Sequence, residues 1–216
     1  MPSHPKQWYP FVLALIGAAV SLAVFQKLPD RMIVHWDMGG NPNGSMPRWL
    51  GASFGPLLIV AIWGLLRAAP ALDPRRENYE KFAAAYDITV AALLAMLFAS
   101  HLMALALALG YPLPVSRIIP VMVGALFVVI GNVVPLARSN FLFGVRTPWT
   151  LSNERVWART HRLAGYAMTA AGFVIIAAAL LLPAAPSATV IIGTATAALI
   201  APAVYSYFTW KREVEK

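Results

Sequence analysis

The sequence predicts an all-α polytopic membrane protein with six transmembrane helices and both termini in the cytoplasm. Of its 216 residues, 59% are hydrophobic and only 12% are charged, whereas soluble proteins average about 45–50% apolar and about 25% charged residues. The mean hydropathy is +0.66. Six stretches are long enough to cross a hydrocarbon core about 30 Å thick, and the basic residues are distributed unequally between the connections that join them.

The six predicted spans cover approximately residues 8–28, 50–70, 82–109, 114–136, 162–182 and 188–210. Each should be helical, because a helix satisfies all its own backbone hydrogen bonds inside lipid. The first stretch is long for the apolar region of a signal peptide, and no A-x-A-like cleavage site follows it before Gln26. We therefore expect it to be retained as a helix.

The Lys and Arg residues predict the topology. With six spans, thirteen of the seventeen fall on the side of the two termini and four on the opposite side, so the positive-inside rule places the termini in the cytoplasm. Because these charges are spread over short connections, no compact basic domain exists to bind nucleic acid. The net charge of +8 therefore indicates topology, and we predict no nucleic-acid partner.

The sequence carries no recognisable catalytic or cofactor motif. Its lack of cysteine excludes disulfides, Cys-based zinc sites and thiol catalysis. Residues 51–55 match G-x-S-x-G, but they open a membrane helix and lack the strand-turn-helix setting that a hydrolase needs. The same residues match G-x-x-x-G, which favours close helix packing inside the protein, with self-association as the alternative. We predict no enzyme activity, no cofactor and no metal.

One long polar connection, the outer loop (29–49), is predicted outside the cell. Its Gly, Asn and Pro residues indicate tight turns, and Trp36 and Trp49 suit a membrane interface. His35 and Asp37 could bind a cation, but the loop lacks the spacing of a calcium site. We favour an ordered loop held by Asp and Asn side-chain turns, in which His35, Trp36 and Asp37 meet a peptide or lipid from outside.

The other long polar connection, the inner connector (138–161), concentrates most of the candidate residues. Pro148 should hold Thr147 extended, Gly144 permits an unusual backbone angle, and Trp149 can lie at headgroup depth. Ser152 is the predicted N-cap of an amphipathic helix that continues into the fifth span.

That amphipathic helix allows two interpretations. Arg155, Arg159 and Arg162 share one face, and Trp157 and His161 lie together on the opposite face. In the first interpretation, the arginines contact lipid phosphates while the two rings act as anchors. In the second, Trp157 and His161 join Arg146 and Thr147 in a shaped cytoplasmic surface for a partner or for gating. One carboxylate and one histidine do not make a catalytic pair.

Polar residues inside the spans are rare and are functional candidates by default. Asp87 and His101 belong to the third span and Asn132 to the fourth. Asp87 and His101 are separated by about 21 Å along a helix, too far to pair directly. They could line a path for an ion or proton, or make only local hydrogen bonds.

At the inner connector the chain resembles the SdpI family of bacterial membrane immunity proteins. That family is marked by N-x-x-F-G-x-R-T-P-W-T-L followed by V-W-x-x-T-H-R-x-x-G. The matching residues here are Asn140, Phe143, Gly144, Arg146, Thr147, Pro148, Trp149, Thr150, Leu151, Val156, Trp157, Thr160, His161, Arg162 and Gly165. The resemblance covers roughly residues 114–210. The outer-loop segment from His35 to Gly44 is similar to an uncharacterised N-terminal domain commonly joined to that family.

The resemblance implies a multi-pass protein of the bacterial cytoplasmic membrane that protects against a secreted peptide toxin. It also implies, as in the founding system, sequestration of a cytoplasmic repressor. The expected partners are therefore a toxin, a cytoplasmic regulator and membrane lipids. We predict an N-terminal membrane domain (1–110) and an SdpI-like domain (111–216). A small transporter or channel for a lipid, ion or peptide is the alternative.

Overall fold

The computed structural model describes residues 8–37 and 39–215, and it is mostly helical. Within this part of the chain, six helical segments are long and apolar enough to cross a membrane. The main helices are α1 (Tyr9–Val24), α2 (Arg48–Leu72), α3 (Ala83–Ala108), α4 (Val115–Val133), α6 (Glu154–Leu181) and α7 (Ala184–Val214). The predicted six-span fold is confirmed, while the orientation of the termini stays a prediction.

Short elements lie at the ends of these helices. Single-turn 3-10 helices follow α1 (η1, Phe25–Lys27) and α4 (η3, Val134–Leu136), and a longer one (η2, Arg76–Phe82) precedes α3. A five-residue helix, α5 (Pro148–Ser152), lies within the inner connector. The amphipathic segment continues without a break into the fifth span as α6, as the sequence predicts.

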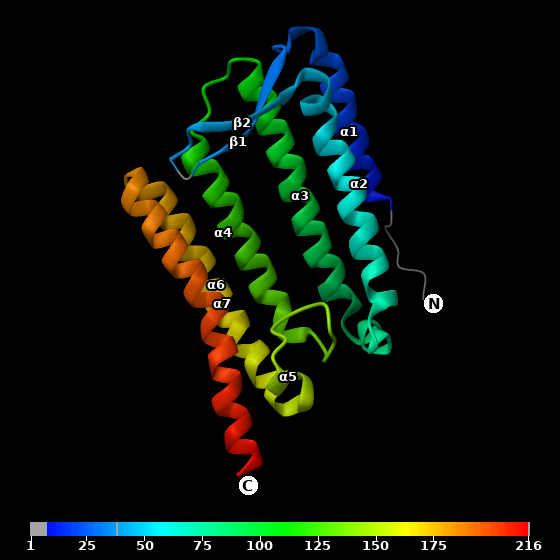
Figure 1. The fold of residues 1–216 in the computed structure, drawn as a ribbon, viewed down its shortest axis with the longest axis vertical. Coiled ribbons are helices and arrows are strands. Elements are labelled where there is room, and N and C mark those ends of the chain that lie inside the picture. Colours follow the sequence, from blue (N-terminus) through cyan, green and yellow to red (C-terminus); the bar gives the residue numbers. More distant parts are fainter. Residues whose placement is uncertain (1–7, 38, 216) are drawn as a thin grey trace. The chain divides into compact units, whose positions relative to one another are not determined.

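The outer loop contains a β-hairpin that the sequence analysis did not predict. Strands β1 (Arg31–Trp36) and β2 (Pro42–Pro47) pair antiparallel, with irregular register near His35. Met32 anchors β1, since its side chain is fully buried against Leu28, Ala52 and Leu105. The spans are therefore helical, as predicted, and a two-stranded sheet lies in the loop between the first two spans (Figure 1).

The residues group into two compact units. Unit 1 combines residues 1–65 with 93–119, and unit 2 combines 66–92 with 120–216. The helices α2, α3 and α4 each contribute to both units. The predicted domains, in contrast, are two continuous segments that meet between residues 110 and 111. That boundary stays a prediction.

Unit 1 uses the glycines of the G-x-x-x-G segment for internal packing. A Cβ atom on Gly51 would lie 3.0 Å from the Met32 side chain, and one on Gly55 would lie 2.4 Å from the ring of His101. His101 is buried and hydrogen-bonds Ser21 at 2.9 Å. Both glycines therefore allow a close approach within the chain, as the packing interpretation predicts.

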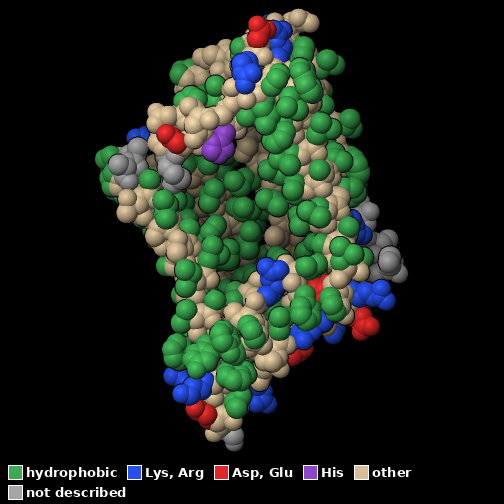
Figure 2. Space-filling view, in the orientation of Figure 1, with side chains coloured by type: hydrophobic (Ala, Val, Ile, Leu, Met, Phe, Trp, Pro, Cys, Tyr) green, Lys and Arg blue, Asp and Glu red, His purple; other side chains and the backbone are tan. Residues whose placement is uncertain are grey.

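Unit 2 is built around α6. Where α6 crosses α4, a Cβ on Gly172 would lie 2.5 Å from the Gly124 carbonyl oxygen, and one on Gly165 would lie 2.7 Å from that of Gly131. On its other side α6 runs beside α7 as an antiparallel pair (Figure 1). On the face shown in Figure 2, hydrophobic side chains cover these helices, and Lys and Arg gather near the C-terminal end of α7.

Candidate functional site

The inner connector has two successive helix caps. Thr147 is extended and caps α5 through a reciprocal pair of hydrogen bonds with Thr150, and Pro148 occupies the first turn. Asn153 then caps α6, because its side-chain oxygen accepts from the N–H groups of Arg155 and Val156. The prediction that Ser152 caps this helix is wrong, since Ser152 is the last residue of α5 and donates to the Trp149 carbonyl.

Asn140 organises the start of the connector. Its side chain is fully buried, and its oxygen accepts from the backbone N–H groups of Leu142 at 3.0 Å and Phe143 at 2.6 Å. Its side-chain nitrogen donates to the Arg138 carbonyl at 2.8 Å. A buried amide with both ends bonded fixes one backbone path, so Asn140 determines the shape of this turn.

Asp73, which the sequence analysis did not select as a site residue, binds the same turn from a distant part of the chain. Its carboxylate is 3% exposed and accepts from the N–H groups of Arg75 at 2.7 Å and Phe141 at 2.8 Å, and from the Tyr79 hydroxyl at 3.0 Å. The Asp-Pro pair after the second span is the only local signal, and such a pair indicates no more than the start of a helical turn. The partner, Phe141, is 68 residues away.

Further hydrogen bonds join the segment after α2, which contains Arg75 and Asn78, to the connector. Arg75 donates to the Ser139 hydroxyl and to the Leu151 carbonyl, and Asn78 donates to the Ser139 carbonyl. Phe143 stacks on Phe82, with ring centroids 5.9 Å apart, and contacts Tyr86 edge-on. The connector is therefore folded against residues 73–86, through both polar and aromatic contacts.

His161 and Trp157 lie together, as predicted, with ring centroids 3.9 Å apart. The His161 Nδ1–H donates to the Trp157 carbonyl at 2.9 Å, and Nε2 accepts from the Val145 N–H at 3.0 Å. Because one nitrogen must donate and the other must accept, these bonds define a neutral imidazole with its proton on Nδ1. The Trp157 indole N–H donates to the Ala137 carbonyl at 2.8 Å.

Gly144 makes this arrangement possible. Its φ of 100° lies in the left-handed region, which glycine adopts without steric cost. A Cβ atom at this position would lie 2.2 Å from His161 Nε2. Gly144 is therefore required both by its backbone angle, as predicted, and by the close approach of the imidazole.

The burial of these rings corrects both interpretations of the connector. Trp157 is 3% exposed, and Thr160 and His161 are fully buried, so the two rings are neither lipid anchors nor part of an exposed partner surface, while a role in gating stays a prediction. Trp157 belongs to a buried cluster with Tyr79, Phe82 and Ala137, whereas His161 lies against Gly144 and Val145 of the connector. Arg146 and Pro148 are exposed, while Trp149 is half-buried against Tyr207.

The arginine face of α6 is exposed, as predicted, but it is partly neutralised. Arg159 pairs with Glu213 of α7 at 2.8 Å, and Arg155 lies 3.6 Å from the same carboxylate. The Glu213 side chain is 6% exposed, so it is the buried member of this group. Arg162 is exposed, and its side chain makes no hydrogen bond or ion pair with the residues that the structure describes.

The outer-loop candidates are held by local hydrogen bonds. Asp37 accepts from the N–H groups of Gly39 and Asn41, both at 2.8 Å, and from the Asn41 side chain. The Asn41 side-chain bond is the main cause that lowers the pKa of Asp37. His35 is exposed and bonds Asn43, and Trp36 is half-buried. This is the loop held by Asp and Asn side-chain turns that the sequence favours.

Two polar candidates inside the spans, His101 and Asn132, make hydrogen bonds within the protein. His101 bonds Ser21, and the Asn132 side-chain nitrogen donates to the Val128 carbonyl of its own helix at 2.7 Å. Since His101 is enclosed by Gly17 and Gly55, its ring is part of the packing of unit 1. The Asn132 bond is local, as one alternative of the sequence analysis expects, whereas the His101 bond joins two spans, and the conduction path stays a prediction.

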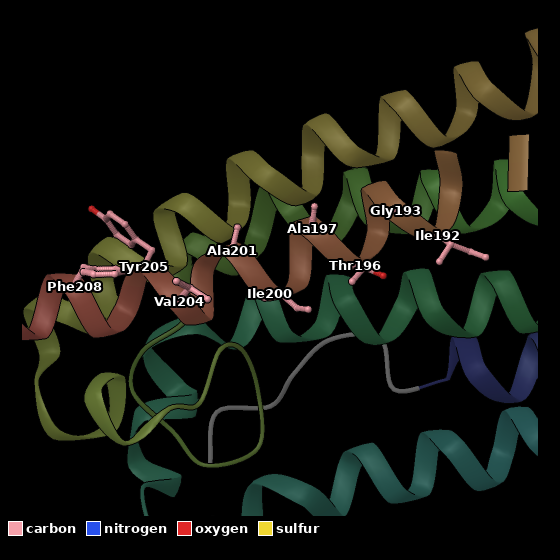
Figure 3. Close-up of a pocket in the computed structure, with 9 residues that line it drawn as sticks. All are labelled: Ile192, Gly193, Thr196, Ala197, Ile200, Ala201, Val204, Tyr205 and Phe208. Atoms are coloured by element: carbon pink, nitrogen blue, oxygen red, sulfur yellow. The ribbon is translucent and has the colours of Figure 1, made fainter. Parts of the chain in front are cut away.

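An open apolar groove of about 750 Å³ follows one face of α7 (Figure 3). Its lining combines small residues such as Gly193, Ala197 and Ala201 with larger ones such as Ile200 and Phe208. The sequence analysis did not select this face. A shallow apolar groove along a membrane helix is suited to acyl chains or to another helix, and nothing in the groove distinguishes them.

A comparison with known protein families gives a match that includes the whole connector. Residues 137–206 match the SdpI/YfhL protein family. The predicted resemblance is confirmed. The SdpI/YfhL region begins at Ala137, whose carbonyl binds Trp157, and it includes the connector, α6 and most of α7. Residues 12–60 match a domain of unknown function, DUF1648, which covers most of α1, the hairpin and the first half of α2.

Immunity protein SdpI of Bacillus subtilis (strain 168) is 26% identical to this chain over 164 residues, which are 76% of each protein. No solved structure gives a significant match. The similarity is therefore to a membrane immunity protein and not to an enzyme family. Together with the six apolar helices, it identifies a multi-pass protein of the bacterial cytoplasmic membrane.

Proposed function

We propose that this protein is an immunity protein that protects its cell against a secreted peptide toxin. The observation that supports this most strongly is the similarity to immunity protein SdpI, which extends over 76% of the chain. The connector adds to it, because Asn140, Gly144 and His161 of the family motif are all used in one hydrogen-bonded structure.

The outer hairpin is the proposed contact for the toxin. Arg31, His35 and Asp37 are exposed along it, and Met32 anchors it to the helices of unit 1. A polar hairpin whose turn is already hydrogen-bonded is suited to recognising a peptide at the membrane surface, since it loses less chain entropy on binding than a disordered segment.

The inner connector is the proposed contact for a cytoplasmic regulator. Its exposed residues Arg146 and Pro148, with the half-buried Trp149, would form the contact surface. Trp157 and His161 would act as positioning residues, because they hold Val145 and the connector in place. A toxin can change the affinity of this surface only if it binds two conformations of the protein unequally.

The experiment is a challenge of toxin-sensitive bacteria with a secreted peptide toxin of the SdpI-type system, with survival and membrane potential as readouts. Cells that express this protein should survive, and Arg146→Ala should lose protection. Arg138→Ala is the matched control, because Arg138 is an exposed arginine of the same connector whose side chain makes no hydrogen bond with the described residues, whereas Arg146 binds the carbonyls of Phe141 and Leu142.

The membrane level of each variant is measured in the same cells. Equal protection by wild type, Arg146→Ala and Arg138→Ala would remove Arg146 from the proposed site. A lack of protection by correctly inserted wild-type protein, against the toxins of several such systems, would contradict the immunity function itself.

A further inference from the structure

The tip of the inner connector presents two adjacent apolar side chains to the outside. Phe141 is 40% exposed and Leu142 is 44% exposed, and they stand between the buried Asn140 and the half-buried Phe143. Two adjacent exposed apolar side chains, on a loop flanked by Arg138 and Arg146, indicate an interaction site. They are also the two positions that the N-x-x-F-G motif leaves unspecified.

The backbone at this tip is bonded within the protein. The N–H groups of Phe141, Leu142 and Phe143 donate to the side chains of Asp73 and Asn140. The carbonyls of Phe141 and Leu142 accept from Arg146 Nη1 at 3.1 and 3.2 Å. In water, backbone N–H and carbonyl groups can bond to solvent. In contact with lipid they must find partners within the protein, because lipid offers none.

The tip also lies close to the ends of membrane spans. Phe141 follows the end of the fourth span, Leu136, by five residues, and its N–H is bound by Asp73, which directly follows the end of the second span. Phe143 packs against Phe82 and Tyr86 in the third span. In Figure 1 the connector turns back at the level of the last turn of α4 before it reaches α5. These neighbours place the tip at the depth of the bilayer boundary.

The charges around the tip match a phospholipid surface. The Arg75 guanidinium lies 5.1 Å from the centre of the Phe141 ring, and Arg146 binds the two carbonyls of the tip. Guanidinium groups pair well with phosphate, and basic residues next to apolar ones are the common pattern of segments that bind anionic lipid.

We propose that the Phe141–Leu142 tip inserts its two side chains into the lipid headgroup boundary, so that the inner connector is docked on the membrane. The apolar pair supplies the contact, and the backbone hydrogen bonds within the protein lower the desolvation cost of the tip. This membrane contact does not depend on the proposed immunity function.

The absence of cysteine makes a direct test simple, because any introduced cysteine is unique. Leu142→Cys carries a nitroxide spin label on the full chain in nanodiscs that contain anionic phospholipid. Glu77→Cys, at an exposed residue of the same unit, is the matched control. Collisions of the label with oxygen, which concentrates in lipid, are compared with collisions with a water-soluble nickel complex.

The proposal predicts that oxygen dominates at position 142 and the nickel complex dominates at position 77. Phe141→Cys is measured in the same way and replaces Leu142→Cys if that variant does not fold. Nickel access at 141 and 142 equal to that at 77 would overturn the proposal. A tip that is open to water in nanodiscs but becomes shielded when cell cytosol is added would also overturn it, in favour of a protein partner.

Discussion

The outer hairpin and the inner connector are both long polar connections, but they use their polar side chains in opposite ways. In the hairpin, Asp37 and His35 bond residues at most eight positions away and remain exposed. In the connector, Asn140 is buried, and the N–H group of Phe141 donates to the buried Asp73, which is 68 positions away. The hairpin is thus a local structure on a scaffold, whereas the connector is part of the scaffold itself.

This difference indicates which motif residues could contact a ligand and which only stabilise the fold. In the connector, Asn140, Gly144, Trp157 and His161 face inward and determine the backbone path. Substituting them would change activity by disturbing the fold, even if no ligand ever touches them. In the hairpin, substitution of a polar side chain should change binding and leave the fold nearly intact.

The largest effect is expected for Gly144→Ala. The left-handed backbone costs an alanine about 1–2 kcal/mol, and overpacking against His161 adds about 1–3 kcal/mol. Gly110→Ala is the matched control, because Gly110 also has a positive φ, 91°, but open space around its Cβ position. Thermal unfolding of the purified protein, followed by tryptophan fluorescence, should show a clearly larger loss for Gly144→Ala. Equal losses would mean that the His161 contact contributes nothing.

The next effect compares two asparagines. Asn140→Ala removes the acceptor of two backbone N–H groups, which should cost about 3 kcal/mol, since each unsatisfied buried donor costs about 1–3 kcal/mol. Asn43→Ala removes one exposed bond of the hairpin and should cost less than about 0.5 kcal/mol. The same unfolding measurement distinguishes them. A similar loss in both variants would erase the contrast between the two connections.

A smaller effect is expected for the two aspartates. Asp73→Asn places an amide group beside donors from Phe141 and Tyr79, and should destabilise the protein by about 2 kcal/mol. Asp37→Asn changes an exposed turn and should leave the unfolding temperature nearly unchanged. A larger fall in unfolding temperature for Asp37→Asn than for Asp73→Asn would contradict this prediction, because it would mean that the hairpin turn contributes more to stability than the buried aspartate.

The smallest effect concerns pH. Because hydrogen bonds, chiefly from Asn41, lower the pKa of Asp37 below its ordinary value of 3.8, the turn should be fully formed above that value. It should be lost only as the pH falls through the lowered pKa. A carboxyl-carbon NMR titration of Asp37 should have its midpoint below 3.8. A midpoint at or above the ordinary value would show that these bonds do not form.

Much of the helical fold could be predicted, because apolar stretches of about 20 residues have few alternatives in a bilayer. The hairpin could not, since β2 contains Pro42, Gly44 and Pro47 and lacks the alternation of an ordinary strand. Met32 of β1 fits against Gly51 of α2, a contact that local sequence does not reveal.

The candidate site was predicted in part. The pairing of Trp157 with His161 follows from helical spacing, and the special backbone of Gly144 follows from its residue type. The burial of Trp157 could not be predicted, because Tyr79 and Phe82 of the same buried cluster are remote in sequence. Ser152 and Asn153 are both good caps, and the choice between them depends on where α5 ends.

Hydrogen exchange of the protein in nanodiscs, resolved to short peptides by mass spectrometry, separates the two connections in one experiment. If the connector is a buried, hydrogen-bonded structure, the amides of Phe141, Leu142, Phe143 and Val145 should exchange as slowly as those in the adjoining turns of α6. The hairpin turn at Gly39 and Asn41 should exchange much faster, since its bonds are local and exposed. Exchange of the connector at the rate of the hairpin turn would contradict this description, because it would mean that the connector opens freely and exposes its buried motif residues Asn140 and His161.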